Sequence, residues 1–256
     1  MPSLLQAIVA VTALSLLSPA VRAEPAAPPA SGGAPVEDGR GDAQQRLRDW
    51  PQLHYYRAEN AALPAPRKGQ PRVVLFGDSI TEGWGRTGSD TFFPGKGYIN
   101  RGISGQTTAQ MLLRFQQDVI ALQPAVVVIL AGTNDIAGNS GPVTQAMIED
   151  NLHAMMALAR EHGIAVVLAS VLPVSDYPWR PGVQPAPKVR ALNAALQRYA
   201  AAQQLVYLDY YTALTNRDGG LDKALAEDGV HPTPAGYARM APLADAAINR
   251  ALAQRR

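Results

Sequence analysis

One serine and one histidine in this chain stand in settings that suit nucleophilic catalysis. Ser79 is the third residue of the segment GDSI, directly after a run of apolar residues. A serine hydroxyl is a weak nucleophile until a base takes its proton, and histidine titrates near neutral pH. His231 follows Asp228 by three residues in the segment DGVHP, so the carboxylate could fix the tautomer of the imidazole. Ser79, His231 and Asp228 are therefore candidates for a catalytic triad.

Two further segments could stabilise negative charge on a reacting oxygen. Gly105 lies in the loop RGISGQTT, where backbone N–H groups that open a helix are free to bind an anion. Asn134 lies in the segment GTND and carries a side-chain amide. Acyl transfer needs such donors aimed at the tetrahedral oxyanion, and the N–H of Ser79 could be a third. Taken singly, each of these segments could also be an ordinary turn or helix cap.

The candidate residues follow apolar runs that are typical of buried parallel strands. These runs cover residues 73–76, 125–130, 164–169 and 205–208, with a weaker fifth at 98–99. Helical patterns lie between or after them, at 108–122, 143–161, 188–203 and 235–253. This alternation predicts a doubly wound, three-layer α/β/α sandwich. Ligands bind beyond the carboxyl ends of the strands in such sheets, which is where the candidate residues fall.

The chain divides into a leader, a linker and one domain. Residues 4–17 form an apolar run that is too short to span a membrane, and residues 1–23 are predicted to be a signal peptide, with an uncleaved anchor as the alternative. Residues 24–43 are rich in Ala, Pro and Gly and predict a flexible tether. The folded domain is expected over residues 44–256. An exported protein, periplasmic or secreted, is the expectation.

Composition excludes several classes of partner and cofactor. The formal net charge is only +2 and the basic residues are scattered, which argues against nucleic acid or an anionic membrane surface as the main partner. The chain has no cysteine, so disulfides, thiolate metal sites and a cysteine nucleophile are excluded. No motif with metal-ligand spacing is present, and no metal is expected.

Taken together, GDSI, GISG, GTND and DGVHP resemble, in this order, the consensus blocks of the SGNH (GDSL) hydrolase family. The resemblance spans residues 72–236 and is closest to esterases of the platelet-activating-factor acetylhydrolase type. It implies a flavodoxin-like parallel sheet of about five strands and no cofactor. It also implies Ser79 as nucleophile, His231 as base and Asp228 as its partner, with Gly105 and Asn134 joining Ser79 in the oxyanion hole. Ile80 stands where the family name implies leucine.

Two aspartates also match these blocks. For Asp78 and Asp135 we expect a role in bracing their loops through hydrogen bonds rather than in the chemistry.

The expected activity is hydrolysis of short-chain acyl esters, including O-acetyl groups on carbohydrate. Four side chains could line the substrate pocket or could simply pack the protein: Trp84, Tyr177, Trp179 and Arg180. A periplasmic lysophospholipase or thioesterase is the alternative within hydrolases. A non-catalytic ligand-binding domain of the same fold is the alternative from another class.

Overall fold

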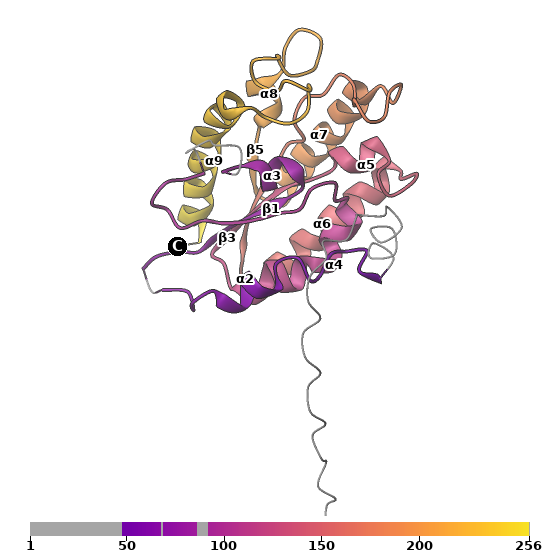
Figure 1. The fold of residues 1–256 in the computed structure, drawn as a ribbon. Coiled ribbons are helices and arrows are strands. Elements are labelled where there is room, and N and C mark those ends of the chain that lie inside the picture. The colour runs from indigo at the N-terminus through magenta and orange to yellow at the C-terminus, as the bar shows by residue number, and fades with distance from the viewer. Residues whose placement is uncertain (1–47, 68, 86–91, 256) are drawn as a thin grey trace, which may run out of the picture. The chain divides into compact units, whose positions relative to one another are not determined.

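A five-stranded sheet lies at the centre of the computed structural model, which describes residues 48–67, 69–85 and 92–255 (Figure 1). The predicted signal peptide and tether lie outside the described residues. The strands are β1 (Val73–Gly77), β2 (Ile99–Gly102), β3 (Val126–Leu130), β4 (Ala165–Ala169) and β5 (Val206–Leu208). Their order is β2-β1-β3-β4-β5, and every neighbouring pair is parallel. All five predicted strands are confirmed, and the weak candidate at 98–99 is the start of the edge strand β2.

Helices precede, connect and follow these strands. They are α2 (Arg57–Ala62), α3 (Ser79–Gly83), α4 (Thr108–Asp118), the 3-10 helix η1 (Ile120–Leu122), α5 (Thr133–Ala137), α6 (Gln145–Glu161), α7 (Pro185–Ala202), α8 (Tyr210–Leu214) and α9 (Pro234–Gln254). The prediction of a single helix over residues 108–122 is wrong in one respect. The segment divides into α4 and η1 because Val119 leaves helical backbone angles, with φ −128° and ψ −67°. Within the described ranges, no helix has the length and apolarity that crossing a membrane requires.

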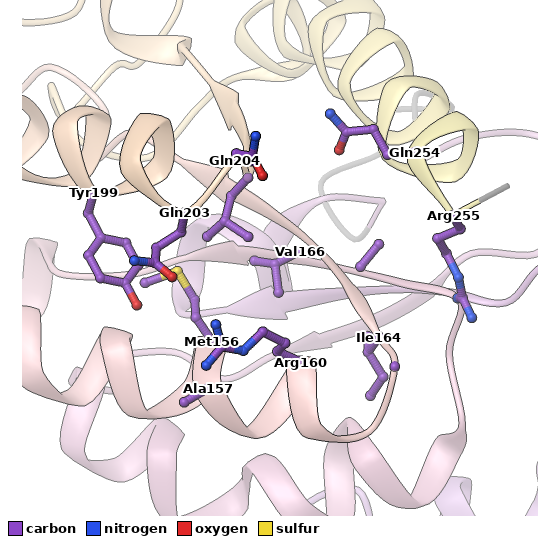
Figure 2. Close-up of a pocket in the computed structure, with 13 residues that line it drawn as sticks. Met156, Ala157, Arg160, Ile164, Val166, Tyr199, Gln203, Gln204, Gln254 and Arg255 are labelled. Carbon is purple, nitrogen blue, oxygen red and sulfur yellow. The ribbon is translucent and has the colours of Figure 1, made fainter.

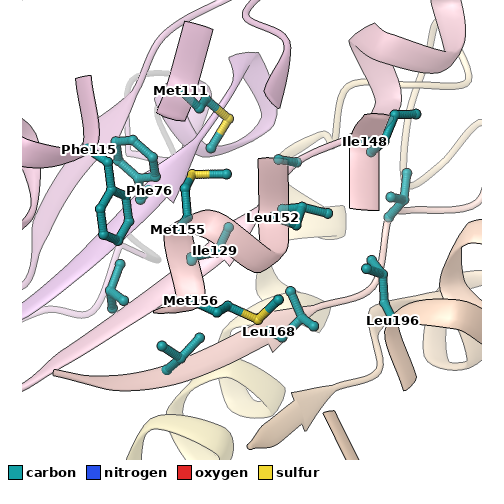
Figure 3. Packing of buried hydrophobic residues seen from close by; sticks show 14 of the residues in the cluster. Phe76, Met111, Phe115, Ile129, Ile148, Leu152, Met155, Met156, Leu168 and Leu196 are labelled. Atoms are coloured by element: carbon teal, nitrogen blue, oxygen red, sulfur yellow. The ribbon is translucent and has the colours of Figure 1, made fainter. Parts of the chain in front are cut away.

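Two helical layers cover the two faces of the sheet, and this confirms the predicted α/β/α sandwich. Successive residues of a strand point to opposite faces, so Val74 and Phe76 pack toward α4, α6 and α7, while Val73 and Leu75 pack toward α9. Figure 1 shows α9 on one side of the sheet and α4 and α6 on the other. In Figure 3, Phe76 lies against Phe115 of α4, with the ring centroids 5.4 Å apart.

Candidate active site

Ser79, His231 and Asp228 form a continuous hydrogen-bonded chain. Ser79 Oγ lies 2.9 Å from His231 Nε2, and His231 Nδ1 lies 2.6 Å from Asp228 Oδ2. The serine and the histidine are 152 residues apart in sequence, so the fold alone brings them together. All three side chains that the sequence singled out thus meet in the arrangement that activates a serine hydroxyl.

The serine is held at the first residue of a short helix. β1 ends at Gly77, and Asp78 caps α3 by accepting a hydrogen bond from the Ile80 N–H at 3.0 Å. The Tyr237 hydroxyl on α9 donates to the Ile80 carbonyl at 2.8 Å. These contacts fix the turn that carries Ser79 at the carboxyl end of β1.

The histidine is held by the loop that precedes α9. Asp228 Oδ1 accepts from the N–H groups of Val230 and His231, at 2.9 and 2.8 Å, while Oδ2 contacts the imidazole. Partial burial raises the pKa of Asp228, but the hydrogen bonds from the side chain and backbone of His231 outweigh it, so the pKa lies below its usual value. Asp228 is therefore a carboxylate at neutral pH and favours the tautomer of His231 that carries its proton on Nδ1 and leaves Nε2 facing Ser79.

Potential oxyanion donors lie at the start of α3, in the loop after β2 and in α5. Within the described part of the chain, the N–H groups of Ser79 and Gly105 donate no hydrogen bond. Gly105 has a φ of +76°, a backbone conformation that favours glycine. The buried Asn134 amide donates to the Gln106 carbonyl at 3.0 Å and accepts from Asn139 at 2.8 Å, which leaves its second N–H for another acceptor.

Hydrogen bonds tie these segments to one another. Glu82, on α3, accepts the N–H of Ser104 at 2.7 Å, so the nucleophile helix holds the residue before Gly105. Asp135 accepts the backbone N–H of Thr108 at 3.0 and 3.1 Å and its hydroxyl at 2.6 Å. This is the bracing role predicted for Asp135. Burial raises the pKa of Asp135, and its bonds to Thr108 oppose that shift.

Sequence reasoning missed three polar side chains that organise these segments. Glu82, Gln106 and Arg114 are all buried, and each bonds to a segment distant in sequence. Arg114 follows two apolar residues in α4 and precedes Phe115, which was the one available signal that it faces the core.

The four candidate substrate-binding side chains separate into two pairs. Trp84 is 3% exposed and stacks on Tyr237, with the ring centroids 5.2 Å apart. Tyr177 is 0% exposed, and its hydroxyl bonds to the side chain and carbonyl of Thr133. These contacts favour the packing interpretation for both.

The other pair lies on the surface. Trp179 is 42% exposed, and its ring centroid is 6.0 Å from that of His231. Its indole N–H donates to Asn139 Oδ1 at 3.1 Å, which fixes the ring. Arg180 is exposed and lies beside Gly138 at the end of α5. Trp179 is thus the candidate that the structure brings next to the imidazole of His231.

Two hollows lie at opposite edges of the sheet. One, of about 350 Å³, is lined by Glu227, Asp228, His231 and residues 232–234. The other, of about 240 Å³, is shown in Figure 2, and its lining includes Arg160, Ile164, Val166 and Gln203. It lies at the amino ends of β4 and β5, whereas Ser79 and Asn134 follow the carboxyl ends of their strands. Only the first hollow adjoins the candidate site.

Among residues 48–67, 69–85 and 92–255, no group of three or more His, Cys, Asp or Glu side chains could hold a metal ion.

Comparison with known proteins agrees with this geometry. Residues 75–239 match the GDSL-like lipase/acylhydrolase family. The isoamyl acetate-hydrolyzing esterase 1 homolog of Bos taurus is 30% identical over 190 residues, which are 65% of this chain and 76% of that protein. An acetylxylan esterase of Xylanibacter ruminicola is 27% identical over 221 residues; the match covers 73% of this chain but only 45% of that enzyme.

Solved structures show the same relationship. The crystal structure of a GDSL-like lipase from Bacteroides thetaiotaomicron superimposes with a TM-score of 0.75 at 45% sequence identity. The superposition covers 79% of this chain and 99% of that one. Because the family match runs through the segments that carry Ser79 and His231, this chain belongs to the GDSL-like lipase/acylhydrolase family and is a carboxylic ester hydrolase.

Proposed function

We propose that Ser79 is the nucleophile of a two-step ester hydrolysis, and the observation that carries this proposal is the hydrogen-bonded chain from Ser79 through His231 to Asp228. In the first step, Ser79 Oγ attacks the acyl carbon while His231 Nε2 takes the hydroxyl proton. The C–O bond to the alcohol then breaks, and His231 returns the proton to the departing oxygen. Water repeats the sequence on the acyl-enzyme, so the acid is released and Ser79 is regenerated.

The negative oxygen of each tetrahedral intermediate is held by the N–H groups of Ser79 and Gly105 and by the free amide N–H of Asn134. The hydrogen bonds of Asn134 to Gln106 and Asn139 support this role, because they fix the amide before substrate binds. Donors that are oriented in advance stabilise the transition state without reorganisation. Asp228 orients His231 and stabilises the imidazolium that forms.

The substrate class that we favour is a short-chain acyl ester, above all an acetyl ester on carbohydrate. Two relatives are named for acetyl esters, one of isoamyl alcohol and one of xylan. The exposed ring of Trp179 beside His231 adds an aromatic surface on which a sugar ring can stack.

The test is hydrolysis of p-nitrophenyl acetate, butyrate, octanoate and palmitate by the wild type and by Ser79→Ala. Activity is expected on the two short esters, and kcat is expected to fall by at least about 10³-fold in the variant. Circular dichroism of Ser79→Ala serves as the control for folding. A variant that keeps most of the wild-type rate contradicts the role of Ser79.

The chain-length profile tests the substrate separately. A preference for octanoate and palmitate contradicts the acetyl-ester proposal and indicates a lysophospholipase or a thioesterase. Hydrolysis of long-chain acyl thioesters would then favour the thioesterase. No hydrolysis of any ester by folded wild type contradicts the catalytic proposal and favours a ligand-binding domain.

A further inference from the structure

Arg114 is a charged side chain buried completely within the core. It lies on α4, and both its side chain and that of Asp118, one turn later, are 0% exposed. Its guanidinium lies over the ring of Phe76, 4.1 Å from the centroid. Burial of a charge is costly unless the charge is paired and hydrogen-bonded, so the contacts of this group explain what the fold gains from it.

The guanidinium donates to four acceptors on four segments. Nη2 donates to the Gly77 carbonyl at 2.9 Å, and Nε donates to Gln106 Oε1 at 2.5 Å. Nη1 donates to the Arg101 carbonyl at 2.9 Å and to Asp118 Oδ2 at 3.2 Å. Only one of these acceptors is a charged partner; the others belong to the ends of β1 and β2 and to the loop after β2.

Two of the acceptors lead directly to the proposed catalytic groups. Gly77 is the last residue of β1, two positions before Ser79. Gln106 follows Gly105, and its carbonyl accepts the amide N–H of Asn134. The side-chain amide of Gln106 also donates to the Pro51 carbonyl at 2.9 Å, so Gln106 is held from both sides. Arg114 therefore connects the turn that carries the nucleophile with the loop that carries the oxyanion donors.

The shape of the guanidinium matters for this connection. Burial lowers the pKa of Arg114 to about 10, and the nearby Asp118 opposes that shift, so the group is a cation at neutral pH. A guanidinium presents donors in a rigid plane, whereas a lysine ammonium is a compact charge on a flexible stem. Lysine could pair with Asp118 but could not reach Gly77, Arg101 and Gln106 at once.

We propose that Arg114 is a positioning residue for acyl transfer, because it holds the Gly77 carbonyl and the Gln106 side chain in a fixed relation and so keeps Ser79 aligned with Gly105 and Asn134. This inference rests on the proposed esterase function. It predicts that loss of the planar donor set slows catalysis more than it weakens substrate binding.

The experiment compares Arg114→Lys with Asp118→Asn in the hydrolysis of p-nitrophenyl acetate. A fluorophosphonate, left to react to completion, counts the reactive serines in each preparation, and kcat is expressed per reactive serine. For Arg114→Lys we expect kcat to fall about 10- to 100-fold with KM little changed, because a displacement of about 1 Å can cost about 100-fold. Asp118→Asn removes the charged partner of Arg114 but leaves the acceptors on β1, on β2 and in the loop after β2. For this variant we expect a lower Tm and a kcat close to the wild-type value. Equal effects of both variants on kcat, or a wild-type kcat in Arg114→Lys, overturn the proposal.

Gln106→Met provides a second test that does not depend on the folding of the arginine variant. It removes the acceptor of Arg114 Nε and keeps the volume of the side chain. We expect a fall in kcat per reactive serine. When Arg114→Lys is added, we expect a further fall that is smaller than the fall it causes in the wild type, because the two residues share one contact but Arg114 also holds the Gly77 carbonyl. An unchanged kcat in Gln106→Met contradicts the proposal. Failure of the esterase function itself is distinguishable, since wild type would then be inactive.

Discussion

The indole ring of Trp179 is the residue-scale feature that most directly bears on the choice of substrate. Its face is accessible, its N–H is held by Asn139, and the buried Tyr177 packs against it with the ring centroids 5.1 Å apart. A ring fixed in this way loses little conformational freedom when a flat apolar surface binds to it. The ring lies 6.0 Å from that of His231, the residue proposed to protonate the departing alcohol, so we expect the alcohol part of an ester to contact it.

We therefore predict that Trp179→Ala discriminates between substrates. On an acetylated xylooligosaccharide, kcat/KM is expected to fall about 3- to 10-fold, as for the loss of one aromatic contact of about 0.5–1.5 kcal/mol. On ethyl acetate, the same variant is expected to stay near the wild-type value, because the ethyl group is too small to cover the indole ring. Trp179→Phe should keep part of the activity on the saccharide. Equal losses on both substrates would indicate a structural role for the ring.

At the residue scale, the sequence is most informative where chemistry restricts the residue type. Ser79, His231 and Asp228 were candidates because few residues can perform the tasks of a triad, and the fold places them in one hydrogen-bonded chain; their catalytic roles stay predictions. Trp84 and Tyr177 show the limit of such reasoning. Aromatic rings serve equally well in a core and in a pocket, and only the tertiary structure shows that these two are buried.

At the scale of elements, the helix α3 depends on how closely it approaches the sheet. A Cβ atom at Gly102, the last residue of β2, would lie 2.1 Å from the Glu82 N and 2.7 Å from the Asp78 carbonyl oxygen. Both are backbone atoms, so they cannot rotate away. The absence of a side chain at Gly102 is what allows α3, with Ser79 at its start, to lie against the end of β2.

Gly102→Ala is consequently expected to displace α3. We predict a loss of about 1–3 kcal/mol in the free energy of unfolding, as for overpacking, together with a marked fall in kcat. Gly163→Ala is the matched control. Gly163 has a φ of +65° but no atom within 4 Å of an added Cβ, so it should lose about 1–2 kcal/mol of stability and keep its kcat. Chemical denaturation and kinetics on p-nitrophenyl acetate measure both effects, and a wild-type kcat in Gly102→Ala would show that α3 does not move.

The boundaries of elements were predictable only where a local signal exists. The strands were found because continuous apolar runs are distinctive, and α9 begins at Pro234 behind the cap Thr233, which the sequence Thr-Pro already suggests. The break after Asp118 has no such signal, since residues 119–122 continue the apolar pattern of α4. The apolar neighbours of Arg114 were a weak signal for its burial, but its acceptors on β1, β2 and the Gln106 loop are known only when these segments are assembled.

At the scale of the whole molecule, the carboxyl edge of the sheet concentrates buried acids as well as catalytic groups. Asp78 is 1% exposed, and among the described residues its Oδ2 has no hydrogen-bond partner. Burial raises the pKa of Asp78 to about 7; the charge of Asp135 adds to the rise, and the Ile80 N–H and His231 oppose it. The folded protein therefore holds a proton on Asp78 that the unfolded chain, with a carboxyl pKa of 3.8, releases more readily.

The sign of the resulting pH dependence follows from linkage. A carboxyl whose pKa is higher in the folded state stabilises the protein fully below the unfolded pKa, and this contribution is lost as pH rises through the folded value. We expect the contribution of Asp78 to the free energy of unfolding to decline between about pH 4 and pH 7 and to level off above. Asp228 has a lowered pKa and acts in the opposite sense. Its contribution to the free energy of unfolding is lost as the pH falls from the usual pKa of an aspartate through the lower pKa of the folded state.

Asp78→Asn isolates this effect, because the amide oxygen can still accept the Ile80 N–H but cannot ionise. The variant is expected to show a smaller fall in Tm between pH 5 and pH 8 than the wild type, measured by differential scanning calorimetry. Some of the fall should persist, since burial also raises the pKa of Asp135. Asp228→Asn is the control and should retain the wild-type decline over this range. If the Tm of Asp78→Asn and that of the wild type fall equally between pH 5 and pH 8, Asp78 is ionised over this whole range. Its negative charge would then add to that of Asp228 in stabilising a positive charge on His231.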